Sequence, residues 1–298
     1  MTSHRGARAM ILGTTLASAM LVGCRKSGDD ESGQIGAAVG ELMSSLDESS
    51  QDGTTTAMAP RLPVLRAPAE LRGPLWRRVL DAALPSAYAG ACIATRFSTC
   101  DAGTRARTFT ACSLGAATLD GSVSLAFSSS PLCLMAAEGE SVTRTASFTL
   151  TGLYGGTLAV TSPGGGQTLK KTATGFEYTV GGMERIVKGA AGRTLVDVTT
   201  TTTAPLEITG SSRADLVITS GSLQVTHRLA GYSVTLTPTN LAWSAHCTCA
   251  ISGSLSGTVA GGKNDGKSAS MRLLGCGEAE VTVAGETTDV TLDRCTAI

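Results

Sequence analysis

The stretch Ala146-Ser147-Phe148-Thr149-Leu150-Thr151 alternates apolar and hydroxyl-bearing side chains at every step. Successive side chains of a β-strand point to opposite faces, so this period of two predicts a half-buried strand with one polar face. The pattern recurs after residue 85, in Phe176 to Val180, Leu216 with Ile218, Val234 with Leu236, Leu241 with Trp243, Ala279 with Val281 and Val283, and Val290 with Leu292. No helical pattern separates these runs, which argues against a parallel α/β fold.

Turn-forming residues punctuate the runs at intervals of about eight to twelve residues. They lie at Gly155-Gly156, Pro163 to Gly166, Gly181-Gly182, Gly189 to Gly192, Ala204-Pro205, Gly210 to Ser212, Ser220-Gly221, Ala230-Gly231, Pro238 to Asn240 and Gly261 to Gly266. The run Thr199 to Thr203 is expected to be an exposed strand end before Pro205. We therefore predict an all-β fold over residues 85–298, a disulfide-bonded antiparallel sandwich or barrel with one short N-terminal helix.

The N-terminus has the order of a secretory signal. Residues 1–8 are basic without an acid, and residues 9–22 are almost wholly apolar or small. This apolar run has fourteen residues, whereas a spanning helix needs roughly twenty. An ordinary cleaved signal peptide and a membrane-spanning anchor are the alternatives to the interpretation that follows.

The residues Leu21-Val22-Gly23-Cys24 resemble the lipobox of bacterial lipoproteins. The resemblance implies that residues 1–23 are a signal peptide, cut just before Cys24, and that the Cys24 thiol carries a diacylglyceryl group. The protein would then be exported and held to the membrane by acyl chains such as palmitate, since two or more chains anchor stably. Arg25 and Lys26 follow instead of an aspartate that would retain the protein in the inner membrane, which favours the outer membrane.

Eight further cysteines form an even set, as expected for four disulfides in an exported chain. They fall into two groups, Cys92, Cys100, Cys112 and Cys133, and Cys247, Cys249, Cys276 and Cys295. Pairing is expected inside each group. Cys247 and Cys249 are two residues apart on a predicted strand, so each should pair with one of Cys276 and Cys295. A four-thiolate zinc site is the rival for the second group, but it normally shows Cys-x-x-Cys pairs.

Two segments precede the β region. Residues 24–58 comprise the lipidated cysteine and a linker; residues 27–58 have seven acids and no basic residue, so the linker should be disordered. A short helix around Ile35 to Leu46 has too few apolar residues to dock firmly. Residues 59–84 are rich in proline and arginine, and Leu75 to Leu84 predicts a short amphipathic helix that packs on the β domain or lies on a membrane surface.

Motifs that carry chemistry are scarce. Gly261 to Ser268 matches the phosphate-binding P-loop pattern, but its flanks are strand-like and Asn264-Asp265-Gly266 suits a hairpin turn. His246 adjoins Cys247, which is expected to be oxidised. Glu278, Glu280, Asp289 and Asp293 occupy polar strand faces, where adjacent strands could bring carboxylates together for hydrolysis or calcium binding.

The balance of 24 basic and 24 acidic residues gives no sign of a nucleic-acid partner. We predict no cofactor, no catalytic residue and no metal ligand. The expected function is a structural or interaction protein of the cell envelope that contacts another envelope component. A carrier of lipid or another apolar ligand is the alternative, and a secreted hydrolase is the least favoured hypothesis.

Overall fold

The structure is a computed structural model. It describes residues 97–114, 117–129, 133–210 and 212–292, together with residues 32, 35, 36, 39, 295 and 297. The predicted helix Leu75 to Leu84 lies outside these residues, as do the signal peptide and Cys24.

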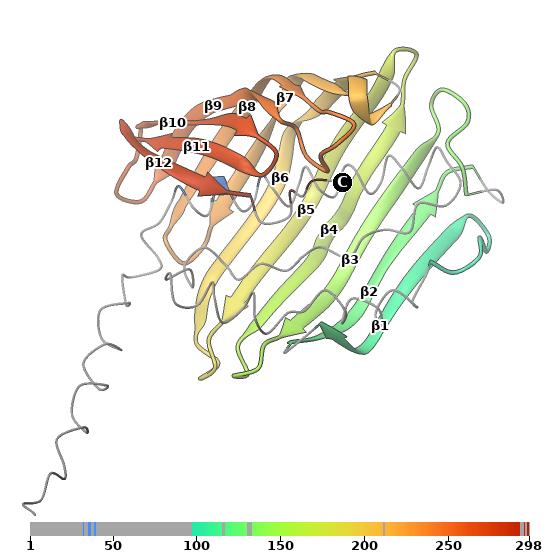
Figure 1. The fold of residues 1–298 in the computed structure, drawn as a ribbon, viewed down its shortest axis with the longest axis horizontal. Helices are drawn as coiled ribbons and strands as arrows, with labels where there is room; N and C mark the ends of the chain where they lie inside the picture. The colour runs from blue at the N-terminus through green and yellow to red at the C-terminus, as the bar shows by residue number, and fades with distance from the viewer. Residues whose placement is uncertain are drawn as a thin grey trace, which may run out of the picture.

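Strands account for almost all of the regular structure (Figure 1). They are β1 (Thr104–Leu114), β2 (Ala117–Phe127), β3 (Ser141–Thr151), β4 (Thr157–Lys171), β5 (Gly175–Lys188), β6 (Thr194–Thr209), β7 (Val217–His227), β8 (Tyr232–Ala242), β9 (Ser252–Gly261), β10 (Ser268–Gly275), β11 (Glu278–Val283) and β12 (Glu286–Thr291). One 3-10 turn, Arg213–Asp215, precedes β7. Each strand pairs with the next, which makes one 12-stranded sheet in sequence order, and the pairing is antiparallel throughout.

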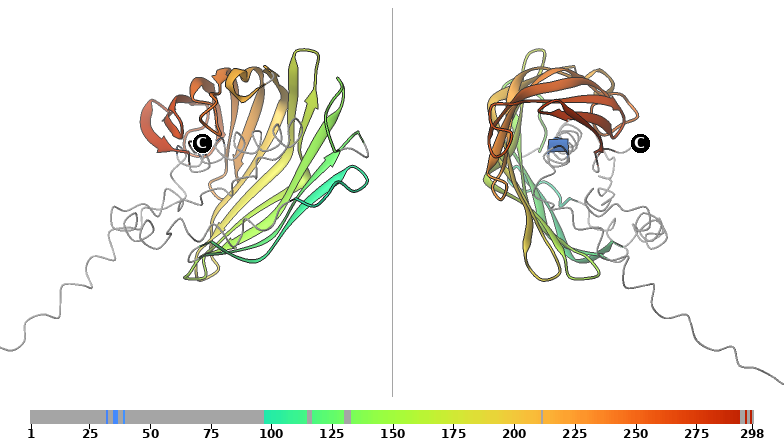
Figure 2. Two further views of the ribbon diagram at one scale, coloured as in Figure 1. Left: turned by 45° about the vertical axis from the view of Figure 1, so that its right-hand side comes forward. Right: turned by 90° about the vertical axis from the view of Figure 1, so that its left-hand side faces the viewer.

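The sheet curls so that one of its faces is concave (Figure 2). The apolar members of the period-two pattern are buried on this side, and the fully buried ones include Val142, Leu169, Tyr178, Val196, Ile218, Val225, Val234, Leu236 and Met271. The hydroxyl members lie on the opposite, outer face. The predicted all-β, antiparallel and disulfide-bonded fold is confirmed, and its strands form a single curled sheet, like part of a barrel wall, without a second sheet packed on it among the described strands.

Register irregularities interrupt six of the strand pairs between β1 and β9, and we call this set the bulge line. It comprises the shifts between Phe109 and Cys112, Arg144 and Ser147, Thr161 and Gln167, Tyr178 and Met183, Thr202 and Ile208, and Thr239 and Ala242. A bulge bends its strand and increases the local twist. Strands as long as β4 (15 residues) and β6 (16 residues) therefore follow the curl without ending.

Half of the predicted turns are not turns in the structure but lie inside strands, at the bulge line. Gly155-Gly156, Gly189 to Gly192, Gly210 to Ser212, Ala230-Gly231 and Gly261 to Gly266 lie at connections between strands, as predicted. By contrast, Pro163 to Gly166, Gly181-Gly182, Ala204-Pro205, Ser220-Gly221 and Pro238 to Asn240 lie inside β4, β5, β6, β7 and β8. Their local chemistry suits a bulge as well as a turn, because both require unpaired backbone and unusual dihedral angles.

Close approach of two backbones explains the glycines of β4 and β5. A Cβ atom on Gly164 would lie 2.2 Å from the carbonyl oxygen of Gly181, and a Cβ on Gly181 would lie 2.2 Å from that of Gly164. No side chain fits in that space. The pair brings β4 and β5 together where their regular register is interrupted.

The threonine run Thr199 to Thr203 is not the exposed strand end that its composition predicted. It lies in the middle of β6, and Thr200 is buried with 2% exposure. Pro205 does not end the strand, because it falls within the register irregularity between Ala204 and Glu207. A proline is tolerated in a strand where the ladder is already interrupted.

Three disulfides lie within the described residues. Cys100–Cys133 links the segment before β1 to the connection between β2 and β3. Cys247–Cys276 and Cys249–Cys295 link the connection between β8 and β9 to the β10–β11 turn and to the C-terminal segment. The strand expected at Cys247 and Cys249 is wrong, because both residues lie in this connection. These pairings confirm that bonds form inside each cysteine group and that Cys247 and Cys249 each pair with one of Cys276 and Cys295, which leaves no thiolates of that group for zinc.

The remaining two cysteines of the first group are Cys92 and Cys112. Cys112 is also disulfide-bonded, and Cys92 lies outside the described residues.

Four residues of the linker are described, and they differ from the predicted disorder. Ser32, Ile35, Gly36 and Val39 are helical, and all four are buried. The right-hand view of Figure 2 places these residues, in blue, inside the curl of the sheet. The physical reason is docking on the sheet, which the composition of the linker does not reveal. Among the described residues, no helical segment has the length and apolar character that crossing a membrane requires.

Candidate functional site

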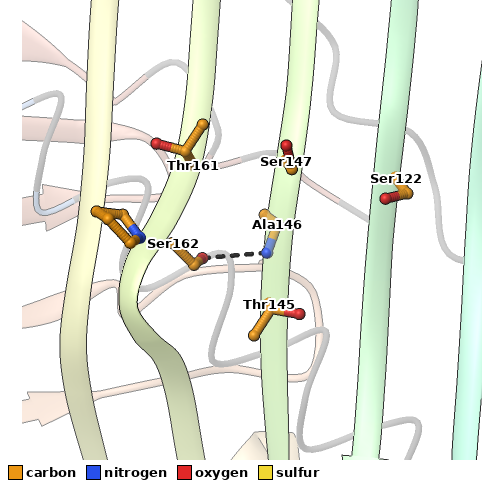
Figure 3. Close-up of a pocket in the computed structure, with 7 residues that line it drawn as sticks. Ser122, Thr145, Ala146, Ser147, Thr161 and Ser162 are labelled. Atoms are coloured by element: carbon orange, nitrogen blue, oxygen red, sulfur yellow. Dashed lines mark hydrogen bonds between the residues drawn. The ribbon is translucent and has the colours of Figure 1, made fainter.

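An open hollow lies on the outer face of the sheet over β2, β3 and β4 (Figure 3). Its volume is about 330 Å³. Five hydroxyl side chains and two small apolar residues line it: Ser122, Thr145, Ser147, Thr161 and Ser162, with Ala146 and Pro163. We call this surface the hydroxyl hollow. It combines several polar side chains in one concave surface of the described residues.

Register and the bulge line together build the hydroxyl hollow. Ser122 pairs with Ser147 across β2 and β3, and Ser147 pairs with Thr161 across β3 and β4, so the three hydroxyls form one row. The register shift between Arg144 and Ser147 then removes Ala146 from the ladder with β4. The Ala146 N–H donates instead to the Ser162 Oγ at 3.1 Å (Figure 3). The side chain thus satisfies a backbone donor that the bulge would otherwise leave unpaired.

A charged group continues the row beyond β4. The Thr161 Oγ1 donates to the Glu184 Oε2 at 3.2 Å, and Glu184 forms an ion pair with Arg228. Asp197 lies 3.4 Å from the same guanidinium nitrogen. The hydrogen bond to Glu184 and the charges of Asp197 and Glu184 raise the pKa of Arg228 above its ordinary value.

The raised pKa of Arg228 adds little to the stability of the fold. The Arg228 side chain is 51% exposed, and solvent screening makes such exposed ion pairs worth little. Arg228 is protonated throughout the physiological pH range with or without this shift, because an arginine titrates only at very high pH. Arg228, with Glu184 and Asp197, therefore extends the polar surface of the hydroxyl hollow with charged side chains.

The hydroxyl hollow offers hydrogen-bonding groups to a ligand. Serine and threonine hydroxyls both donate and accept hydrogen bonds. No histidine, cysteine or carboxylate belongs to its lining. The lining matches a neutral polar ligand, such as peptide backbone or sugar hydroxyls.

A second polar group lies on the concave face, at the same bulge line. Arg144 and Gln167 have 2% and 1% exposure, and the Arg144 Nη1 donates to the Gln167 Oε1 at 2.9 Å. The Gln167 Nε2 donates to the Met183 sulfur at 3.1 Å, and Met183 pairs with the buried Thr200. We call these four residues the inner polar strip.

Two further cationic or titratable groups are buried apart from the strip. Arg107 has 5% exposure, and its guanidinium lies 5.0 Å from the centre of the Phe109 ring. His227 has 1% exposure, and its Nδ1 accepts from the Ala230 N–H at 3.2 Å. Arg107, Arg144 and His227 each have at least one further polar, ring or electrostatic partner. Buried guanidinium groups need such compensation, because removing a charge from water is costly.

The P-loop match is a hairpin connection. Residues Gly261 to Ser268 join β9 to β10, and the Gly266 N–H donates to the Val259 carbonyl at 2.8 Å. Asp265 accepts from the Gly261 N–H at 2.7 Å, which holds the turn. A strand follows this loop in place of the helix that phosphate binding requires, so the hairpin interpretation is confirmed.

The carboxylates considered for catalysis lie on the outer face of the C-terminal strands. Glu280 pairs with Asp289 across β11 and β12, and Arg272 donates to Glu280 from two nitrogens at 3.0 and 2.5 Å. Glu278 is exposed, and Asp293 lies outside the residues whose placement is described. Within the described part of the chain, no three His, Cys, Asp or Glu side chains converge as a metal site would require.

His246 is exposed beside Cys247, whose sulfur is bonded to Cys276. No thiolate is available there for His246 to assist. The oxidised state expected for Cys247 is confirmed.

Sequence reasoning missed the hydroxyl hollow. The outward phase of Ser147 was predictable, but Ser122 and Thr161 join it only through strand pairing, which sequence spacing alone does not reveal. The available signal was Ser162 at the start of Pro163 to Gly166, an interruption inside a long alternating region. Comparisons of the chain with protein-family models, curated proteins and solved structures found no match.

Proposed function

We propose that this chain is an exported protein, lipidated at Cys24, that contacts another component of the cell envelope through the outer face of its curled sheet. The observation that carries the proposal is the hydroxyl hollow. It is the concave polar surface that the described outer face offers, and the apolar side chains of the same strands are buried on the other face.

The chemistry of the outer face indicates the kind of partner. Hydroxyl rows across β2, β3 and β4 present donors and acceptors at the regular spacing of paired strands. The balanced composition and the neutral lining of the hydroxyl hollow do not favour a highly charged partner. We therefore expect a neutral polar partner, such as the backbone and small side chains of another envelope protein.

Site-specific photo-crosslinking in intact cells tests this function. A photoreactive residue at Ser147, which is exposed in the hydroxyl hollow, should capture a discrete partner. The matched control is Ser256, an exposed serine of β9 that lies outside the hollow. A reproducible product from position 147 alone supports the proposal. Equal products at both positions, or no product from position 147, contradict it.

A carrier of lipid or another apolar ligand is the second candidate. A single curled sheet with many buried apolar side chains on its concave face favours it, because such a face can surround an acyl chain. Native mass spectrometry of the protein, purified without added lipid, tests this candidate. A bound lipid of defined mass would support a carrier, and a protein free of bound lipid would exclude it in favour of the interaction role.

A further inference from the structure

The helical residues of the N-terminal linker are packed against the last strand of the sheet. Ile35 and Val39 have 1% and 0% exposure and are four residues apart, so they lie on one face of the helix. Ser32 has 9% exposure and lies on the same side. Short isolated helices are marginal in water, and most helical stability in proteins comes from packing of an apolar face.

The contact is close at Gly36. A Cβ atom on this residue would lie 3.1 Å from the Val290 Cγ2 and 3.7 Å from the Leu292 Cδ2. Val290 belongs to β12, and Leu292 follows this strand with 0% exposure. The lack of a side chain at Gly36 lets the helix backbone approach the edge strand of the sheet.

The linker and the concave face also carry charged groups of opposite sign. Residues 27–58 contain seven acids and no basic residue, whereas the buried concave face carries the guanidinium groups of Arg107 and Arg144. Opposite charges attract more strongly in a weakly polarisable interior than in water. The concave face thus matches the linker in apolar character, and its cationic groups are opposite in sign to the charge of the linker as a whole.

We propose that the concave face binds the chain's own N-terminal segment, with Ile35 and Val39 docked against Val290 and Leu292. The docking also sets the position of the domain, a consequence that rests on the proposed lipidation of Cys24. Only eight residue steps separate Cys24 from Ser32, and they span at most about 29 Å when fully extended. A free linker ending at residue 58 would have let the domain move much farther from the membrane, so the β12 side of the sheet lies close to the lipid surface.

Hydrogen exchange of the mature protein in detergent micelles, read by mass spectrometry, tests the docking. Peptides covering residues 33–40 should exchange at least tenfold more slowly than an unstructured chain. Val39→Asp should abolish this protection and leave β3 to β7 protected. Leu274→Asp is the matched control, because Leu274 is an apolar residue of β10 with 45% exposure, and it should leave the protection of residues 33–40 unchanged.

A double-mutant cycle tests the contact between Gly36 and Val290 directly. Gly36→Leu should lower the protection of residues 33–40 at least tenfold, because the new side chain overlaps Val290. Val290→Ala removes the nearest methyl group, so the double variant should regain protection to within about threefold of Val290→Ala alone.

Exchange of residues 33–40 at the unstructured rate in the native protein, or strictly additive effects of the two substitutions, would overturn the docking. Neither result depends on Cys24, so a failure of the docking is distinguishable from a failure of the lipidation.

Discussion

Gln167 is the described hydrogen-bond acceptor of a guanidinium group that is almost fully removed from water. Its amide oxygen accepts from the Arg144 Nη1, and its amide nitrogen contacts the Met183 sulfur. A buried charged donor that loses an acceptor keeps its desolvation penalty, so the position is sensitive even though it holds a neutral side chain.

We expect Gln167→Leu to lower the free energy of unfolding by about 1.5 to 3 kcal/mol, the range for hydrogen bonds to charged groups. Gln224→Leu is the matched control. Gln224 is only half-buried, and its one described side-chain hydrogen bond, to Thr235, is 3.5 Å long, so its loss should remain below about 1 kcal/mol. Urea denaturation measures the free energy of unfolding of both variants. Equal losses would show that the hydrogen bonds of the inner polar strip stabilise the fold no more than an ordinary half-buried hydrogen bond.

The stability lost when a glycine is replaced by alanine should also depend on the surroundings of that glycine. Gly221→Ala should destabilise by about 3 kcal/mol or more, since its φ is +104° and the new Cβ would lie 2.2 Å from the Pro205 oxygen. Gly192→Ala, with φ +76° and open space, should lose about 1 to 2 kcal/mol. A Cβ at Gly275 would lie in open space, and this residue has no positive φ. Gly275→Ala should therefore change the free energy of unfolding by less than about 0.5 kcal/mol. Thermal unfolding should rank the three in this order, and a mild Gly221→Ala would contradict the close approach at the bulge line.

At the scale of elements, the sequence predicted the strands well and their ends poorly. Alternation at Ala146 to Thr151 and Phe176 to Val180 reports burial on one face, which is a local property of each strand. Pro163 to Gly166 and Ala204-Pro205 look like turns because bulges and turns use the same residues. Only the pairing of β4 with β5 and of β6 with β7 distinguishes them, and that pairing depends on residues distant in the chain. The hydroxyl hollow was hidden for the same reason.

Removing one disulfide should have a local and a global effect. Cys247→Ala with Cys276→Ala opens a loop with a sequence separation of 29, and should lower the free energy of unfolding by about 2 to 4 kcal/mol. Hydrogen exchange should also rise at residues 275–278, which form the β10–β11 turn. Unchanged stability by chemical denaturation would mean that the β-sheet alone holds this end of the molecule.

At the scale of the whole molecule, one curled sheet has to bury a long apolar face without a second sheet opposite it among the described strands. The even set of cysteines and the period-two pattern predicted a disulfide-bonded β domain. They did not predict that the domain extends to Ile35 and Val39, because a linker with seven acids has the composition of a disordered segment. Docking depends on complementarity with β12 and the concave face, which composition does not report.

The central claim is that a lipid anchor at Cys24 holds this β domain at the cell envelope. Mass spectrometry of the mature protein, purified from cells without reduction, tests it most directly. We predict an N-terminus at Cys24 that carries the added mass of acyl chains. The other eight cysteines should all be oxidised, with Cys100–Cys133, Cys247–Cys276 and Cys249–Cys295 among the bonds. An unmodified N-terminus at Cys24, or a chain that has lost its signal without gaining lipid, would contradict the account.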